Sequence, residues 1–202
     1  MVRLIAGLVG LFFSGMLLIS FVTGAYTAVT EPVAPTVESQ FLKHPKKVSF
    51  KHDGPFGSYD KAQLQRGLKV YAEVCSACHS LNQVAFRNFE DLGYSEDEVK
   101  AIAKGWKTEV PSINPETGEP ATRPGLPSDK IPSPYANETA ARAANNNALP
   151  PDLSLMTKAR HNGTAYVYSL LTGYQAVPAN LPKESRPGAG LHYNPYFANL
   201  NL

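Results

Sequence analysis

The longest apolar run of the chain lies at its amino terminus, where residues 4–22 (LIAGLVGLFFSGMLLISFV) are almost wholly apolar. No charged residue falls between Arg3 and Glu31. At about 1.5 Å per residue, a helix of this length spans the ~30 Å hydrocarbon core of a bilayer. A cleaved signal peptide has a shorter apolar region and a small-residue cleavage site, and no good site follows here. The run therefore predicts an uncleaved transmembrane helix, with a cleaved signal and a buried soluble helix as alternatives.

Beyond this run, the polar and apolar positions predict a connector followed by helices. Residues 31–57 contain several prolines and show little periodicity, which is typical of an extended connector. Asp60 can cap a helix that runs directly into Cys75, and Ser95 with Glu98 predicts a capping box for a second helix. The apolar side chains that recur at helical spacing in these two helices are Leu64, Leu68, Tyr71, Val74, Val99, Ile102, Ala103 and Trp106.

The second half of the chain predicts short helices separated by loops. Residues 111–134 contain seven prolines, which exclude a regular helix or a central strand and predict a long irregular loop. Asn137 and Asn162 can cap helices, and no run alternates convincingly with period two. The later helices are expected at residues 138–146, 153–156 and 162–173.

The predicted fold class is all-α with long irregular loops, plus an amino-terminal transmembrane helix. The segments expected are a transmembrane helix or signal-anchor at 1–30, the connector at 31–57, and one helical domain at 58–202. Hydrophobic residues make up 43% of the chain and charged residues 18%, and much of that imbalance lies in the first thirty residues. The net charge of +2 is too small to indicate nucleic acid as a partner, although it leaves a charged docking partner open.

The chain has only two cysteines, Cys75 and Cys78, and His79 follows them directly. A disulfide across so short a loop cannot stabilise a fold, so the pair indicates a chemical site. Cys-x-x-Cys-His supplies two thiols for the vinyl groups of a haem and an imidazole for its iron. A zinc site needs further ligands, and a thioredoxin-like pair needs a strand–helix context. We expect one covalently attached haem c, with zinc, a redox pair and chance occurrence as weaker alternatives.

The second axial ligand of such a haem is harder to find. A haem that transfers electrons usually has methionine or histidine opposite the proximal histidine. Met1 and Met16 lie in or before the membrane segment, and Met156 is at helical spacing from Leu153, which is typical of a core residue. The remaining candidates, His161 and His192, are typical of surface or capping histidines. None of these residues is a convincing distal ligand.

The segment around the haem motif resembles a known family. Its run Arg66-Gly67-Leu68-x-Val70-Tyr71-x-x-Val74-Cys75-x-x-Cys78-His79-Ser80 is similar to cytochrome c1, the haem-c subunit of ubiquinol–cytochrome c reductase. Further segments resemble the same family in the same order, over roughly residues 50–200. They are Arg123-Pro124-Gly125 with Asp129, Pro132-x-Pro134-Tyr135-x-Asn137 with Ala140-Ala141-Arg142, Pro150-Pro151-Asp152-Leu153-Ser154, Ser169-Leu170-Leu171-Thr172-Gly173-Tyr174, and Asn194-Pro195-Tyr196-Phe197.

The resemblance implies a cytochrome c-like haem domain that transfers electrons. The electrons would come from the Rieske iron–sulfur protein and would pass to a soluble or membrane-bound cytochrome c. The chain would form a complex with cytochrome b and the Rieske protein. By position, Arg123 would lie near a haem propionate, and a solvated loop arginine is the alternative. Tyr135, Pro150 and Pro151 would line the haem crevice. The domain would not be catalytic by itself.

Covalent haem attachment takes place on the outer side of an energy-transducing membrane. We therefore expect an inner-membrane protein, in contact with lipid, whose haem domain faces the periplasm or the intermembrane space. In the resembled family, the methionine ligand and a carboxy-terminal anchor lie beyond the segment that corresponds to Asn194–Phe197, so we expect the sequence to be a fragment, with a natural short form as the alternative. The alternative functions are a free-standing membrane-anchored electron shuttle and a haem sensor or peroxidase with an open iron position.

Overall fold

The structure is a computed structural model that describes residues 1–31 and 33–202. The chain divides into two compact units. The first unit comprises Met1–His44 and Gly173–Leu202, and the second comprises Pro45–Thr172. The described residues are mostly helical, which confirms the predicted class.

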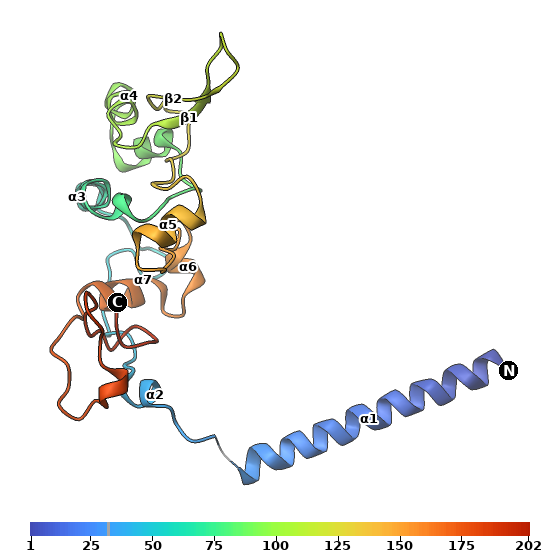
Figure 1. Ribbon diagram of the computed structural model, residues 1–202. Coiled ribbons are helices and arrows are strands. Elements are labelled where there is room, and N and C mark those ends of the chain that lie inside the picture. The colour runs from blue at the N-terminus through green and yellow to red at the C-terminus, as the bar shows by residue number, and fades with distance from the viewer. Residues whose placement is uncertain (32) are drawn as a thin grey trace. The chain divides into compact units, whose positions relative to one another are not determined.

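Helix α1 (Val2–Thr30) is the long amino-terminal helix in Figure 1. It contains 29 residues, none of them buried, and it is long and apolar enough to cross a membrane. A helix that is apolar around its whole circumference has no polar face to present to water. The helix predicted at residues 4–22 is confirmed and extends further in both directions.

The rest of the first unit is largely irregular. Helix α2 (Val37–Phe41) was not predicted, because five residues are too few to show a period. Its amino terminus is capped by Thr36, whose hydroxyl accepts a hydrogen bond from the Ser39 N–H at 3.2 Å. The unit also contains the 3₁₀ helix η3 (Lys183–Ser185). Its small core is formed by Leu181, Tyr193 and Leu200, against which Val37 and Phe41 pack.

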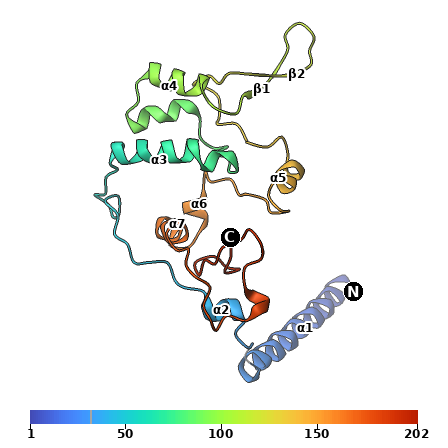
Figure 2. The same cartoon turned by 60° about the vertical axis from the view of Figure 1, so that its left-hand side comes forward.

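The core of the second unit lies between three helices. They are α3 (Lys61–Glu73), the 3₁₀ helix η2 (Phe86–Leu92) and α4 (Glu96–Lys104). Figure 2 shows η2 as the unlabelled green helix between α3 and α4. The sequence did not predict η2, although it carries two core aromatic residues. The buried core residues are Phe86, Phe89, Val99, Ala103 and Ile131.

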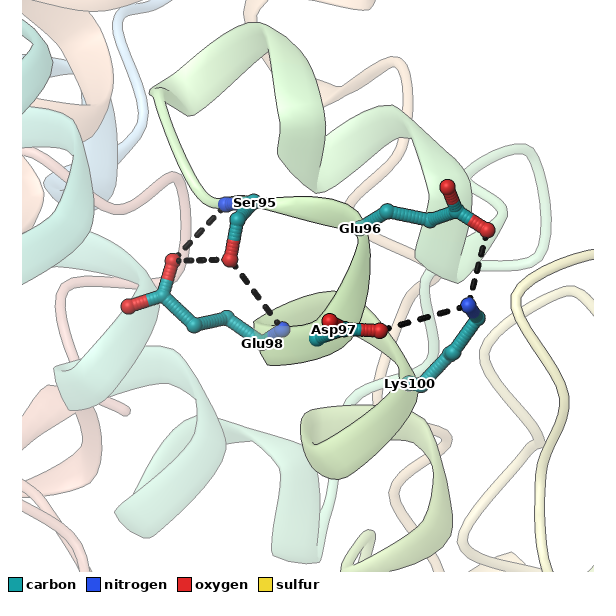
Figure 3. Close-up of polar contacts among 5 residues, drawn as sticks. All are labelled: Ser95, Glu96, Asp97, Glu98 and Lys100. Atoms are coloured by element: carbon teal, nitrogen blue, oxygen red, sulfur yellow. Dashed lines mark hydrogen bonds and ion pairs between the residues drawn. The ribbon is translucent and has the colours of Figure 1, made fainter.

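The predicted capping box at the start of α4 is confirmed (Figure 3). The Ser95 hydroxyl accepts from the Glu98 N–H at 3.4 Å, and the Glu98 carboxylate accepts from the Ser95 N–H at 2.7 Å. Hydrogen bonds from the backbone and then the hydroxyl of Ser95 hold the pKa of Glu98 below its ordinary value. Lys100 pairs with Glu96 at 2.8 Å and with Asp97 at 3.3 Å on the exposed side of the same helix. These contacts fix where α4 begins.

We expect Ser95→Ala to lower the free energy of unfolding by about 1 kcal/mol, because it removes the acceptor for the Glu98 N–H. Denaturant unfolding measures the change. Ser58→Ala, in an exposed loop, serves as the matched control and should leave the midpoint within experimental error. Because the folded-state pKa of Glu98 is lowered, its contribution is present above the unfolded-state pKa and is lost as pH falls through the folded-state pKa. Equal midpoints for Ser95→Ala and the control would contradict the prediction.

The prediction that residues 111–134 form one long irregular loop is wrong, although the strands found there are edge strands and not the central strand that the prolines were taken to exclude. Strand β1 (Val110–Ile113) pairs antiparallel with β2 (Pro120–Arg123), and Val110 lies opposite Arg123. Two prolines occur in the ladder because each strand of a two-stranded ribbon has a free edge, where a missing N–H breaks no ladder hydrogen bond. The hairpin is a small addition and leaves the fold class unchanged.

Three short helices follow the hairpin: α5 (Glu138–Ala144), α6 (Met156–Ala159) and α7 (Gly163–Leu171). The Asn137 cap is confirmed, since its side-chain oxygen accepts from the Ala140 N–H at 2.9 Å. The predicted cap at Asn162 is wrong, because the φ angle of Asn162 is 58°, in the left-handed region, and its side chain makes no capping hydrogen bond. Helix α6 begins only at Met156, so the Pro-Pro-Asp-Leu-Ser segment before it is loop.

Candidate haem site

The Cys-x-x-Cys-His motif forms a tight turn at the end of α3. The α-helix ends at Glu73, one residue earlier than predicted, and the 3₁₀ helix η1 (Cys75–Ala77) follows. The Cys75 carbonyl accepts from the Cys78 N–H at 3.1 Å and from the His79 N–H at 2.8 Å. Both cysteines are partly exposed free thiols. One hydrogen-bonded turn therefore carries both sulfur atoms and the imidazole.

The His79 ring is held by the loop that precedes α6. Its Nδ1 lies 2.8 Å from the carbonyl oxygen of Pro151. Because a carbonyl oxygen can only accept, this contact places the proton on Nδ1 and leaves the lone pair of Nε2 free to bind a metal. The Tyr71 hydroxyl donates to the His79 carbonyl at 2.9 Å. Burial, with smaller contributions from Asp152 and Cys75, raises the pKa of Tyr71 to about 12, so it remains a donor at neutral pH.

Asp152 joins the loop to the chain that follows His79. Its carboxylate accepts from the Ser80 hydroxyl and the Asn82 N–H, both at 2.8 Å, and from the Ser154 N–H at 3.0 Å. Partial burial of this carboxyl opposes its ionisation, but the hydrogen bonds outweigh burial and hold its pKa below the ordinary value. The Leu153 N–H also donates to the Ser80 carbonyl at 2.9 Å. The two segments are therefore tied together beside the imidazole.

A hollow of about 340 Å³ opens beside this turn. Cys78 lines it, and so do Tyr135, Pro150 and Pro151, the three residues expected to line a haem crevice. The Tyr135 hydroxyl accepts from the Asn145 side-chain amide at 2.9 Å, which fixes the ring in place. Of the three motif residues only Cys78 lines the hollow among the described residues, and Cys75 and His79 lie on the same turn beside it. The chemistry of the turn, with paired thiols and an oriented imidazole, fits a covalently attached haem.

Arg123 does not line this hollow, as far as the described residues show. Its guanidinium binds both carboxylate oxygens of Asp129, at 2.6 and 2.9 Å, and this pairing holds the pKa of Asp129 below its usual range. The glycine of the Arg-Pro-Gly segment, Gly125, is buried where a Cβ atom would lie 2.7 Å from the Ala103 carbonyl oxygen. Contact of Arg123 with a haem propionate stays a prediction.

Three residues of the site received no role from the sequence. Tyr71 was assigned only to an apolar helix face, and Asp152 and Ser154 were quoted only as part of a motif. The Asp-x-Ser spacing is a turn signal that could have indicated the Ser154 N–H contact. Neither Met156 nor His161 lines the hollow among the described residues, and His192 belongs to the other unit. The distal ligand therefore stays unassigned.

A Cys-x-x-Cys-His turn with an oriented imidazole, in a small helical unit, defines the class of c-type cytochromes. A model of the Cytochrome C1 family matches residues 50–202. The chain belongs to this family, which confirms the resemblance found in the sequence, and c-type haem is characteristic of the family.

Individual relatives give the same result. The chain is 47% identical over 176 residues to "Cytochrome c1 1, heme protein, mitochondrial" of Arabidopsis thaliana, covering 87% of this chain and 55% of the relative. It is 47% identical over 154 residues to "Cytochrome b-c1 complex catalytic subunit, mitochondrial" of Candida albicans (76% and 52%). It is 52% identical over 131 residues to "Cytochrome c1" of Rhodospirillum rubrum (65% and 47%). The chain thus spans about half the length of the curated relatives it matches.

Proposed function

We propose that this chain carries one covalent haem c and is the electron-transfer subunit of a membrane-bound ubiquinol–cytochrome c reductase. Cys75 and Cys78 provide the thioether bonds, and His79 provides the proximal iron ligand. The observation that carries the proposal is the 2.8 Å contact between His79 Nδ1 and the Pro151 carbonyl, made from the turn that bears both thiols. When bound, the haem supplies a one-electron redox couple.

The residues around the turn bind and orient the cofactor. Pro151 fixes the tautomer of His79, so that Nε2 carries no proton and would be free to bind the iron of a haem. Tyr135 and Pro150 line the hollow, and their side chains would exclude water from a haem bound there. Exclusion of water lowers the solvent reorganisation energy when the iron changes its charge. It also raises the influence of nearby dipoles on the redox potential. The protein therefore contributes position and electrostatic environment and forms no bonds in a substrate.

The proposed partners are cytochrome b, the Rieske iron–sulfur protein as electron donor and a cytochrome c as acceptor. The support is family membership together with the printed name of the Candida albicans relative, a cytochrome b-c1 complex subunit. That name favours a complex subunit over a free-standing shuttle. Helix α1 is apolar and exposed enough to lie in lipid, which supports an inner-membrane location. We place the haem domain on the periplasmic or intermembrane-space side, where covalent haem is attached.

The test is to purify the full-length gene product from its native membranes and extract it with acidified organic solvent. We expect the pigment to stay on the polypeptide and to give the pyridine haemochrome spectrum of a haem with two thioether bonds. Cys75→Ala with Cys78→Ala should remove nearly all of it. Ser76→Ala is the matched control, because it alters the same turn but keeps both thiols and the imidazole. Pigment that washes out of the unaltered protein would refute covalent haem.

The same preparation tests membership of the complex. We expect cytochrome b and a Rieske protein to co-purify with this chain in fixed proportion through two different separations. A monomer that carries covalent haem but neither partner would leave the cofactor assignment intact. That result would refute the subunit assignment in favour of the electron shuttle.

A further inference from the structure

Asp152 links the two chain segments whose contact orients His79: it belongs to the segment of Pro151, and its carboxylate binds the segment of His79. Ser80 follows His79 directly, and its hydroxyl donates to Asp152 Oδ2 at 2.8 Å. Asp152 itself follows Pro151 directly, and Pro151 is the residue whose carbonyl accepts from His79. The hydrogen bond between Ser80 and Asp152 therefore lies directly beside the hydrogen bond between His79 and Pro151.

Two further contacts make this connection rigid. The Asn82 N–H donates to the same carboxylate oxygen at 2.8 Å, and the Gln83 N–H donates to the Ser154 hydroxyl at 3.0 Å. The ring of Pro151 fixes its φ angle, so the direction of its carbonyl depends on the peptide plane that it shares with Asp152. Holding Asp152 in place therefore fixes the direction of the carbonyl that faces His79.

We propose that Asp152 is a positioning residue for the haem iron: through Pro151 it holds the imidazole of His79 in orientation and sets its strength as a ligand. The inference rests on the proposed function, since it takes His79 as the iron ligand. A firm hydrogen bond at Nδ1 makes Nε2 a stronger donor, which favours ferric iron and lowers the reduction potential. Hydrogen bonds to a charged carboxylate are stronger than neutral ones, which suits Asp152 to this role.

The negative charge of Asp152 could change the reduction potential without any effect on the orientation of His79, so the experiment has to separate charge from positioning. Removing any negative charge near a haem raises its reduction potential, because the ferric form loses a favourable interaction. The potential alone therefore does not distinguish positioning from charge. The g values of the ferric haem in an electron paramagnetic resonance spectrum report the orientation and donor strength of the axial imidazole, and a distant charge does not move them.

The experiment compares four variants of the full-length, haem-loaded protein in native membranes: Asp152→Ala, Asp152→Asn, Ser80→Ala and Glu138→Gln. Asp152→Asn removes the charge but keeps one acceptor oxygen, whereas Ser80→Ala keeps the charge and removes one hydrogen bond. Glu138→Gln is the matched control, because Glu138 lines the same hollow and its loss leaves the contacts of Asp152 in place. Covalent haem, reduction potential and g values are measured for each.

We expect Asp152→Ala to raise the potential and shift the g values most, with Asp152→Asn and Ser80→Ala giving smaller shifts in g. Glu138→Gln should raise the potential and leave the g values unchanged. If Asp152→Ala does not accumulate, Asp152→Asn and Ser80→Ala carry the test. Unaltered g values in both of these variants, with haem still attached, would overturn the positioning role alone. Absence of covalent haem from the unaltered protein would instead refute the proposed function.

Discussion

Phe86→Ala should destabilise the Pro45–Thr172 unit by about 3–5 kcal/mol, a large part of the stability of a small domain. Phe86 is fully buried between α3 and α4. Its ring lies 6.0 Å from that of Phe89 and 5.4 Å from that of Trp106, both in edge-on contact. The surrounding helices cannot close the space left by a benzyl group without moving Phe89 and Trp106, so the substitution leaves a cavity.

The chain offers a matched control and its own probe for this measurement. Phe56→Ala makes the same chemical change at a side chain that is 97% exposed, and it should alter stability by less than about 0.5 kcal/mol. Trp106 is the only tryptophan of the chain and contacts the Phe86 ring, so its fluorescence reports unfolding of this core. Similar denaturation midpoints for the two variants would show that Phe86 does not contribute the predicted packing energy.

The helices that the sequence predicted well are those with local signals at their amino termini. Asp60, Ser95 and Asn137 each accept a hydrogen bond from the residue three positions later, and this spacing can be read directly from a sequence. The 3₁₀ helix η2 has no comparable signal, although it carries Phe86 into the core. The β1–β2 hairpin was missed because the seven prolines were taken to indicate an irregular loop; they exclude a central strand, whereas proline is tolerated at the free edge of a two-stranded ribbon.

The candidate site divides in the same way between local and distant contacts. Cys75, Cys78 and His79 were identified because their chemistry depends on adjacent positions. The partner of the imidazole, Pro151, is 72 residues away in the sequence and lies in a loop without periodicity. Only the family resemblance drew attention to that loop, and it gave no role to Asp152. Pairing between distant loops depends on the tertiary fold, which residue spacing does not encode.

His79→Ala should abolish the low-spin spectrum of the haem and slow electron transfer per haem by more than about 100-fold. Loss of a residue that only supports a metal ligand already costs about 10–100-fold, and loss of the ligand itself should cost more. The substitution keeps both thiols in the turn and removes the imidazole whose Nδ1 is held by Pro151. Rates are divided by the amount of covalently attached haem, so that poorer attachment is not counted as slower transfer.

His161→Ala is the matched control for this loss, because it removes an imidazole from an exposed position in the same unit. Its spectrum and its rate per haem should equal those of the unaltered protein. Free imidazole added to His79→Ala can bind where the side chain was, and it should restore the low-spin spectrum. An unchanged spectrum in His79→Ala would show that the iron ligand lies elsewhere than in the Cys-x-x-Cys-His turn. Loss of the low-spin spectrum in His161→Ala would instead make His161 a second axial ligand.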